Sequence, residues 1–425
     1  MKSEKERVLA QVDALRDELT ELTAELVRIP TVNPPGDAYE DCARFIGDKL
    51  KRCGFEVELD VATERPEHTE QHPRWNVIGS RRGGAKGPTL HLNGHFDVVP
   101  AGAGWTVDPF AGIVKDGKIW GRGTCDMKGG IAASVFASEA LRRAGVDVPG
   151  TIEISGTCDE ESGGFAGVAH LAQIGRVAKG RTDYVIIPEP LNVDRICIGH
   201  RGVYWFEVET LGRTAHGSMP FLGVSAIEHM GAILEAVRTE LKPVLETRQT
   251  RMPVVPHGSG RATINVNALI GGQANQTVQS PCVADRTRAI FDRRFLIEES
   301  FDATRHEIVE LLDRVAARVP GLRYEMHDQM IVHPVEAPEG SPLVETLKRS
   351  IADVLGKQAA IIASPGTYDQ KHFSRIAGVH HCVAYGPGVL ELAHQPDEWC
   401  GIDDLVNATK VLALTAIDLA AWGAP

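Results

Sequence analysis

The chain has 425 residues, of which 43% are hydrophobic and 24% are charged, a composition typical of a globular protein. Because a single hydrophobic core rarely fills so long a chain, we expect two domains. The formal net charge of −12 argues against a nucleic acid or an anionic membrane as partner, since both attract basic patches.

The N-terminal residues 1–29 alternate apolar and charged side chains at helical spacing, without the uninterrupted apolar stretch of a signal peptide. No apolar run reaches the roughly 18 residues that a membrane-spanning helix needs. The eight cysteines are scattered, with no C-x-x-C pair, which favours free thiols over disulfides or a thiolate metal site. We therefore expect a cytoplasmic protein without a membrane partner.

The first half of the chain alternates short apolar runs with helical patterns, as an α/β sheet domain does. Strands are predicted at residues 75–80, 89–95, 151–157 and 183–189. Residues 127–145 carry small side chains early and arginines late, which predicts a helix.

The pattern changes in the middle of the chain. The predicted elements there are, in order, a strand at 204–212, a helix at 224–240, strands at 263–270 and 284–294, and a helix at 302–318. This order indicates a small α+β layer inserted into the larger domain. The α/β pattern then resumes and ends in a helix at residues 404–422. We expect the larger domain at residues 1–199 and 330–425 and the inserted domain at 200–329.

Four short segments hold acids and histidines at the ends of predicted strands. In the first, GHFDVVP, His95 and Asp97 lie two residues apart, so an extended chain points both to the same side. His95 can then bind a metal ion while Asp97 orients its ring. A structural histidine beside an exposed aspartate has the same pattern, so this motif alone leaves both interpretations open.

The other three segments contain carboxylates and a late histidine. Asp126 in GRGTCDMKGG is either a helix N-cap or a carboxylate that bridges two cations. TCDEESGG has Asp159, Glu160 and Glu161 directly after an apolar strand. Such a run usually marks a solvated loop, but its position at the mouth of a sheet favours a cation partner. His394 in AHQPDEW is by itself either a ligand or a structural residue.

Taken together and in this order, the segments resemble the M20 metallopeptidase family, which includes acetylornithine deacetylase, succinyl-diaminopimelate desuccinylase, aminoacylase and glutamate carboxypeptidase. The resemblance covers nearly the whole chain. Its further motifs are WTVDPFAG, PEP, GRTAHGS, GGQANQTV, FDRR, GTYDQKH and YGPG. It implies an α/β fold in which a mixed-sheet di-metal catalytic domain carries an inserted α+β, ferredoxin-like lid and dimerisation domain.

The resemblance also implies that five residues bind two divalent cations: His95, Asp126, Glu161, Glu189 and His394. Asp126 would bridge both ions, His95 and Glu189 would complete one site, and Glu161 and His394 the other. Mixed histidine and carboxylate ligands suit zinc, and also manganese or cobalt. The family further implies a cis peptide bond after Asp126.

The expected mechanism follows from these positions. Two neighbouring cations can share a water molecule, lower its pKa and polarise the substrate oxygen. Glu160, next to a ligand, is the expected general base, and Asp97 would hold the ring of His95. By resemblance, His216 reaches the neighbouring subunit's site in a homodimer and stabilises the developing oxyanion. The alternative for His216 is a surface histidine in a glycine-rich turn.

Five further positions are predicted to contact the substrate. The resemblance implies that Asn275 and Arg294 hold the substrate, and that Arg294 binds the carboxylate of the substrate. In GTYDQKH, Thr367 keeps the family's pattern, whereas Tyr368 and Lys371 stand where better-known members have a small residue and an arginine. A tyrosine and a lysine in the pocket would change its size and its carboxylate contacts. An aromatic substrate would then fit, unless Tyr368 packs inward.

We therefore expect an enzyme that hydrolyses a C–N bond of a small carboxylate-bearing substrate. Deacylation of an N-acyl amino acid or of a dipeptide-like amide is the first hypothesis. Hydrolytic deamination, which would release ammonia from an amino-substituted aromatic acid, is the alternative within the same class. A catalytically inactive relative that binds a ligand is the alternative outside it, and the complete ligand set together with Glu160 argues against it.

Overall fold

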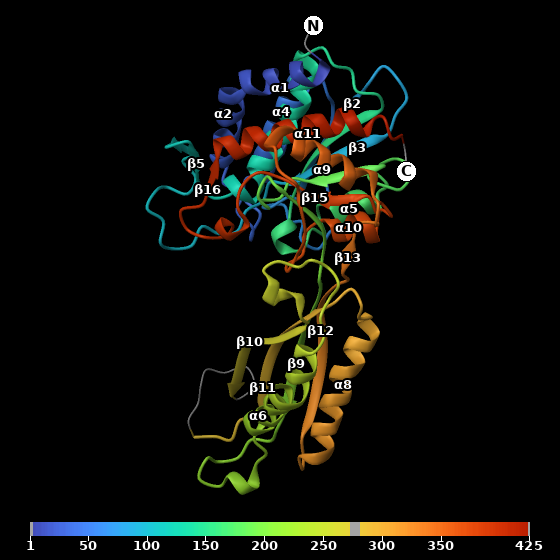
Figure 1. Cartoon of the computed structure of the whole chain (residues 1–425). Coiled ribbons are helices and arrows are strands. Elements are labelled where there is room, and N and C mark those ends of the chain that lie inside the picture. Colours follow the sequence, from blue (N-terminus) through green and yellow to red (C-terminus); the bar gives the residue numbers. More distant parts are fainter. Residues whose placement is uncertain (1–2, 273–280, 424–425) are drawn as a thin grey trace. The chain divides into compact units, whose positions relative to one another are not determined.

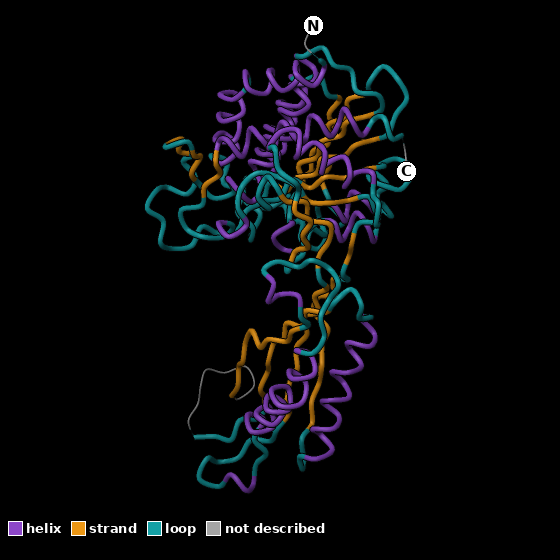
Figure 2. Tube along the Cα trace, viewed as in Figure 1, coloured by secondary structure: helices purple, strands orange, loops and turns teal. Residues whose placement is uncertain are grey.

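The computed structural model describes residues 3–272 and 281–423 (Figure 1). The chain divides into two compact units, each with helices and strands (Figure 2). The first unit comprises Met1–Gly199, Glu336–Ile362 and Tyr368–Pro425, and the second comprises His200–Val335 and Ala363–Thr367. Within the described ranges, none of the helices combines the length and the apolar character needed to cross a bilayer.

The first unit is built on a nine-stranded mixed sheet in the order β1, β2, β6, β3, β7, β15, β8 and β13, with β14 paired to β8. Its strands are β1 (Glu56–Val61), β2 (Trp75–Arg82), β3 (Thr89–His95), β6 (Thr151–Thr157), β7 (Tyr184–Ile187), β8 (Arg195–His200), β13 (Val335–Glu336), β14 (Ala360–Ser364) and β15 (Cys382–Ala384). Strands β6, β3 and β7 are parallel neighbours, whereas β2 runs antiparallel to β6. The sheet confirms the predicted α/β class.

Helices cover this sheet and pack against one another. They are α1 (Glu4–Ala14), α2 (Arg16–Val27), α3 (Tyr39–Arg52), α4 (Gly129–Arg143), α5 (Val168–Gln173), α9 (Pro342–Leu355), α10 (Gln370–Arg375) and α11 (Ile402–Leu419). Helix α4 contacts β3, β6 and α11, and α11 also packs on α1 and α9. Apolar residues at helical spacing bury one face of α11, including Leu405, Leu412 and Leu419.

A small three-stranded sheet joins two distant parts of the first unit. Its strands are β4 (Ile113–Lys115), β5 (Lys118–Trp120) and β16 (Trp399–Gly401), in the order β16, β5, β4. Trp399 pairs with Trp120, so the segment before β16 lies beside the segment after β5. These two segments carry His394 and Asp126.

The second unit is an antiparallel four-stranded sheet with helices. The strand order is β10 (Thr263–Gly272), β11 (Arg286–Phe295), β9 (Gly202–Leu211) and β12 (Arg323–Val332), and the helices are α6 (Ala226–Ala236), α7 (Lys242–Glu246) and α8 (Phe301–Arg318). Side chains of β9 alternate between buried and half-buried, as expected for a sheet with one face covered. Phe206 and Phe291 stack in its core with ring centroids 5.0 Å apart.

Strand β12 was not anticipated from the sequence. It is an edge strand in which most side chains stay exposed. Its alternation of exposed and half-buried side chains extends only from Arg323 to His327, because the register shifts between Asp328 and Met330. It pairs with β9 through Val332, which lies beyond residue 330, the expected start of the returning segment. Pairing with a distant strand therefore decided what the local pattern left open.

Candidate metal centre

Three of the predicted metal ligands lie where parallel strands end. His95 is the last residue of β3, Glu161 follows the end of β6, and Glu189 follows the end of β7. Because β6, β3 and β7 are adjacent and parallel, their carboxyl ends meet at one edge of the sheet. Asp126 lies in the single turn Thr124–Lys128 that precedes α4. His394 comes from the segment before β16.

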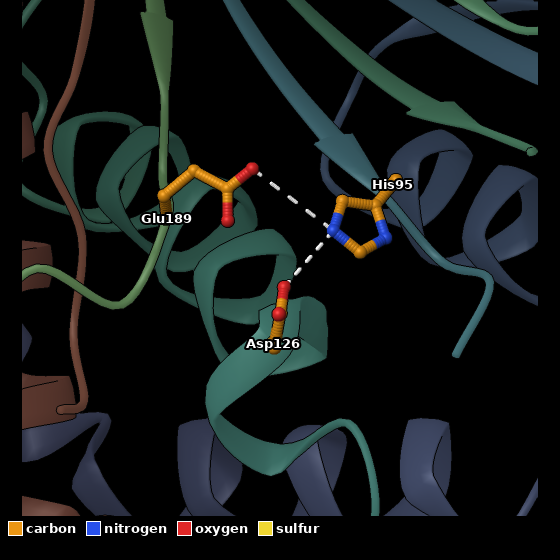
Figure 3. A group of neighbouring side chains, drawn as sticks. All are labelled: His95, Asp126 and Glu189. Carbon is orange, nitrogen blue, oxygen red and sulfur yellow. Dashed lines mark hydrogen bonds and ion pairs between the residues drawn. The ribbon is translucent and has the colours of Figure 1, made fainter. Parts of the chain in front are cut away.

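The five side chains form two groups that share Asp126. His95 Nε2 lies 3.0 Å from Asp126 Oδ1 and 4.0 Å from Glu189 Oε1 (Figure 3). His394 Nε2 lies 3.3 Å from Asp126 Oδ2 and 3.1 Å from Glu161 Oε2. Within each group the potential ligand atoms all lie within 4.8 Å of one another. Asp126 thus turns one carboxylate oxygen to each group.

The carboxylates of this cluster repel one another. Burial, and then the nearby Asp126, raises the pKa of Glu189 well above its usual range and that of Glu161 to about 7. For Asp126, burial favours the protonated form, but hydrogen bonds from His394 and His95 outweigh it and lower its pKa. Hydrogen bonds to Asp126 and Glu161 raise the pKa of His394 to about 10. Crowded carboxylates thus hold protons that they would otherwise lose. Divalent cations would take the place of these protons, and the nitrogen and oxygen donors of the cluster suit such ions.

Asp97 holds two parts of the centre at once. Its buried carboxylate accepts the backbone N–H groups of Glu160 and Glu161, each at 3.1 Å, and an N–H of Asn33 at 2.8 Å. Its carbonyl oxygen lies 3.0 Å from Nδ1 of His95, which leaves Nε2 directed toward Asp126. Asp97 therefore orients the imidazole and the acidic turn together.

The three consecutive acids after β6 point to different partners. Asp159 has the left-handed backbone angle φ of 63°, and its carboxylate accepts from Nε of Arg74 at 2.7 Å. Glu161 faces the second ligand group. Glu160 Oε1 instead lies 3.4 Å from Nζ of Lys371. The turn thus separates charges that would repel one another in an extended chain.

A further acid, Glu398, was missed in the sequence. It is fully buried and accepts from Arg122 Nη1 at 2.7 Å. It also accepts from the backbone N–H groups of Gly123, Cys125 and Asp126 at 3.0, 2.9 and 3.3 Å. These bonds fold the backbone that leads directly to Asp126. In the sequence, Glu398 is marked only by its place in AHQPDEW. Its bonds to residues 122–126 depend on the pairing of β16 with β5, which no local pattern indicates.

The start of α4 approaches the segment after β7 very closely. A Cβ atom on Gly130 would lie 2.1 Å from the carbonyl oxygen of Pro188, so only glycine fits there. This close approach brings Glu189, the next residue, beside Asp126. The peptide bond between Asp126 and Met127 is cis, as expected.

Two of the predicted site residues, His216 and Arg294, are described by their contacts within the second unit. His216 is exposed, and its Nδ1 lies 2.8 Å from Oγ of Ser218. Arg294 on β11 donates two hydrogen bonds to Asp292, at 2.7 and 2.9 Å. Asn275 lies outside the described residues. That these side chains act at the metal centre stays a prediction.

The GTYDQKH segment lies at the start of α10. Thr367 is half-buried. Tyr368 is 5% exposed, and its hydroxyl donates to Oε1 of Gln370 at 2.6 Å. Lys371 is 4% exposed. The predicted substrate contacts of Thr367, Tyr368 and Lys371 stay predictions.

Comparison with known proteins identifies the family of the chain. The sequence model of peptidase family M20/M25/M40 matches residues 91–418. The chain belongs to this family. It is a hydrolase that acts on C–N bonds, and the family resemblance seen in its motifs is confirmed.

Similar proteins match this chain over nearly its full length. Succinyl-diaminopimelate desuccinylase from Methylobacterium radiotolerans is 29% identical over 407 residues, which cover 93% of this chain and 95% of that protein. The desuccinylase of Xanthomonas campestris pv. campestris is 29% identical over 419 residues, covering 95% and 99%. Aminopeptidase PepT from Bacillus cereus shares the fold with a TM-score of 0.75 at 22% identity, covering 96% and 99%. Human carnosine dipeptidase 1 does so with a TM-score of 0.72 at 20% identity, covering 98% and 100%.

Proposed function

We propose that this M20 family member hydrolyses the amide bond of a small N-acyl amino acid, or of a dipeptide-like substrate, that carries a carboxylate. Two divalent cations, zinc or else manganese or cobalt, would be bound by His95 and Glu189 on one side and by Glu161 and His394 on the other. The observation that carries the proposal is the division of the two Asp126 oxygens between the two ligand groups, at 3.0 and 3.3 Å from their histidines. That division is what a bridging carboxylate requires.

Bound in this way, the cations would lower the pKa of a shared water and polarise the substrate carbonyl. Glu160 accepts one proton from that water and transfers it to the leaving nitrogen as the C–N bond breaks. Glu161 is less suited to this transfer, because His394 Nε2 lies 3.2 and 3.1 Å from its two oxygens. The products are a carboxylate from the acyl group and a free amine.

The second unit is proposed to complete the site in a homodimer. His216 would donate a hydrogen bond to the developing oxyanion, while Asn275 and Arg294 would hold the substrate. Apolar side chains on α6 and on the edge strand β10 support self-association: Ile227, Leu269 and Ile270 are 52%, 56% and 59% exposed. A sheet edge with such side chains favours pairing with another chain.

The relatives and the cysteines narrow the proposal further. Because the similar proteins are named as desuccinylases, N-succinyl amino acids are the first substrates to test. All eight cysteines are free thiols, seven of them buried, as we expect in the reducing cytoplasm. The deaminase alternative assumed that Tyr368 lines the substrate pocket. Its buried ring and its bond to Gln370 give that alternative no support.

The test is a reconstitution assay. The protein is stripped of metal with a chelator and reloaded with zinc, manganese or cobalt in turn. Each form is then assayed against N-succinyl and N-acetyl amino acids, dipeptides and amino-substituted aromatic acids. Metal-dependent release of an amino acid supports the amide hydrolase, whereas release of ammonia replaces it with the deaminase. No turnover with two bound metals would favour the ligand-binding relative.

Glu160→Ala is the control for the general base. We expect it to keep both metals and to lose about 10²- to 10⁴-fold in kcat, the usual contribution of a positioned acid or base. Substantial activity in this variant would disprove the assignment of Glu160.

A further inference from the structure

Lys371 is a buried cation beside the proposed general base. It is 4% exposed, and its Nζ lies 3.4 Å from Oε1 of Glu160. Among the described residues, Glu160 is the carboxylate that forms an ion pair with it. Burying an ammonium group is costly unless it is paired, so this contact explains how Lys371 is tolerated.

The helix that carries Lys371 is fixed to the sheet on one side. Nε2 of Gln370, the preceding residue, donates to the carbonyl oxygens of Cys382 at 2.6 Å and Ile198 at 3.1 Å. Tyr368 in turn donates to Gln370 at 2.6 Å. These bonds hold the first residues of α10 in place, in a helix whose side chains from Gln370 to Ser374 are all buried.

The same helix is also tied to the acidic turn. Nε2 of His372 lies 2.7 Å from the carbonyl oxygen of Gly163, which closes the turn that contains Glu160. On the other side of this turn, Asp97 accepts the backbone N–H of Glu160. The backbone of Glu160 is thus held from two sides. Its carboxylate, at the end of a flexible side chain, has Lys371 as its ion-pair partner.

We propose that Lys371 is a positioning residue that holds the carboxylate of Glu160 in the orientation needed for proton transfer, and that it does not bind the substrate. The ammonium group engages Oε1, which leaves Oε2 to accept the proton of the attacking water. Without the cation, the carboxylate would rotate among several rotamers and meet the water less often. This inference rests on the proposed function, because it requires Glu160 to act as the base.

The test separates kcat from KM in variants at this position. Lys371→Met keeps the length of the side chain but removes its charge. We expect it to bind two metals, to keep KM within about twofold, and to lose about 10- to 100-fold in kcat, as when residues that orient a catalytic group are lost. Lys371→Arg keeps a cation and should recover most of this loss. Arg375→Met, which removes an exposed cation from the same helix, should leave both constants unchanged.

A double variant shows whether Lys371 acts through Glu160. In the Glu160→Gln background, Lys371→Met should cause little further loss of kcat, because the group that it positions is already absent. An increase of tenfold or more in KM with unchanged kcat would overturn the inference and assign Lys371 to the substrate carboxylate. An equal loss of kcat in Lys371→Arg and Lys371→Met would also overturn the inference. If thermal melting shows that Lys371→Met unfolds, Lys371→Gln replaces it in the same comparison with Lys371→Arg. Full activity of Glu160→Gln would disprove the assignment of Glu160 as the general base and would overturn this inference with it, whereas metal-dependent amide hydrolysis is tested separately by the reconstitution assay.

Discussion

The two units hold their polar side chains in different ways. In the first unit, every predicted ligand except His394 is buried or half-buried, and the backbone around the ligands is fixed by buried carboxylates such as Asp97 and Glu398. In the second unit, His216 is exposed, and its ring contacts a serine two residues away. The candidate ligands of the first unit are therefore held by contacts within that unit, whereas the exposed ring of His216 would become fixed only through a further contact.

The largest expected effect is the loss of the shared ligand. Asp126→Ala removes the carboxylate that serves both groups, so we expect it to bind neither cation tightly and to lose nearly all turnover. The loss should exceed the roughly 10- to 100-fold cost of removing a residue that only orients a ligand. Metal content by elemental analysis, together with kcat, measures it. Asp17→Ala, an exposed acid on α2, is the control, and two tightly bound metals in Asp126→Ala would contradict the bridge.

The next effect tests the second unit. His216→Ala should lower kcat by about 10²- to 10³-fold, as when an oxyanion donor is removed, and should leave the metal content unchanged. His306→Ala removes an exposed imidazole from α8 of the same unit and should have no effect.

Mixing two inactive variants shows which subunit supplies the histidine. If His216 acts in its neighbour's site, subunits with His216→Ala and subunits with Glu160→Ala should regain activity when they are mixed and allowed to exchange. The mixed dimer then contains one site with both groups intact. An inactive mixture that has formed mixed dimers would show that His216 acts within its own chain or not at all.

A smaller effect is expected at Glu398. Glu398→Gln keeps the shape of the side chain but weakens the acceptor of three backbone N–H groups and leaves the charge of Arg122 unpaired. We expect metal affinity or kcat to fall by about 10- to 100-fold. Metal titration and steady-state kinetics measure this, with the exposed Glu391→Gln as the matched control. Unchanged values would mean that the backbone before Asp126 is held by other bonds.

The smallest effect concerns pH. Burial and Asp126 raise the pKa of Glu161 from 4.5 to about 7 in the metal-free protein. Between these two values the unfolded chain has already lost this proton while the folded chain keeps it, so metal-free stability should fall as pH rises from about 5 to 7. Cation binding displaces the proton, so metal affinity should rise over the same range, by up to about tenfold per pH unit for each proton released. Thermal melting without metal tests the expected fall in stability with rising pH. Calorimetry of metal binding in two buffers tests the expected rise in metal affinity and the release of protons.

Most of the elements and part of the site could be predicted from the sequence. The apolar runs that became β2, β3, β6 and β7 are short, buried and bounded by turn residues, so local composition was sufficient. His95 and Asp126 were candidates from local features, namely the spacing of GHFDVVP and the glycine-rich turn, but these features left a structural role equally open. Glu189 and His394 were identified only through the family resemblance, since neither has a local signal that separates a ligand from a structural residue.

The sequence by itself determined the class of the fold and the family, and it supplied the candidate metal ligands, because these depend on side chains read in order along the chain. Only the tertiary structure decided which residues support them. Glu398 meets the backbone before Asp126, and Lys371 meets Glu160, across more than 200 residues of chain. Edge strand β12 likewise became recognisable only through its pairing with β9. Such pairings depend on the closing of long loops, and no local pattern of residues records which distant partner a buried charge will find.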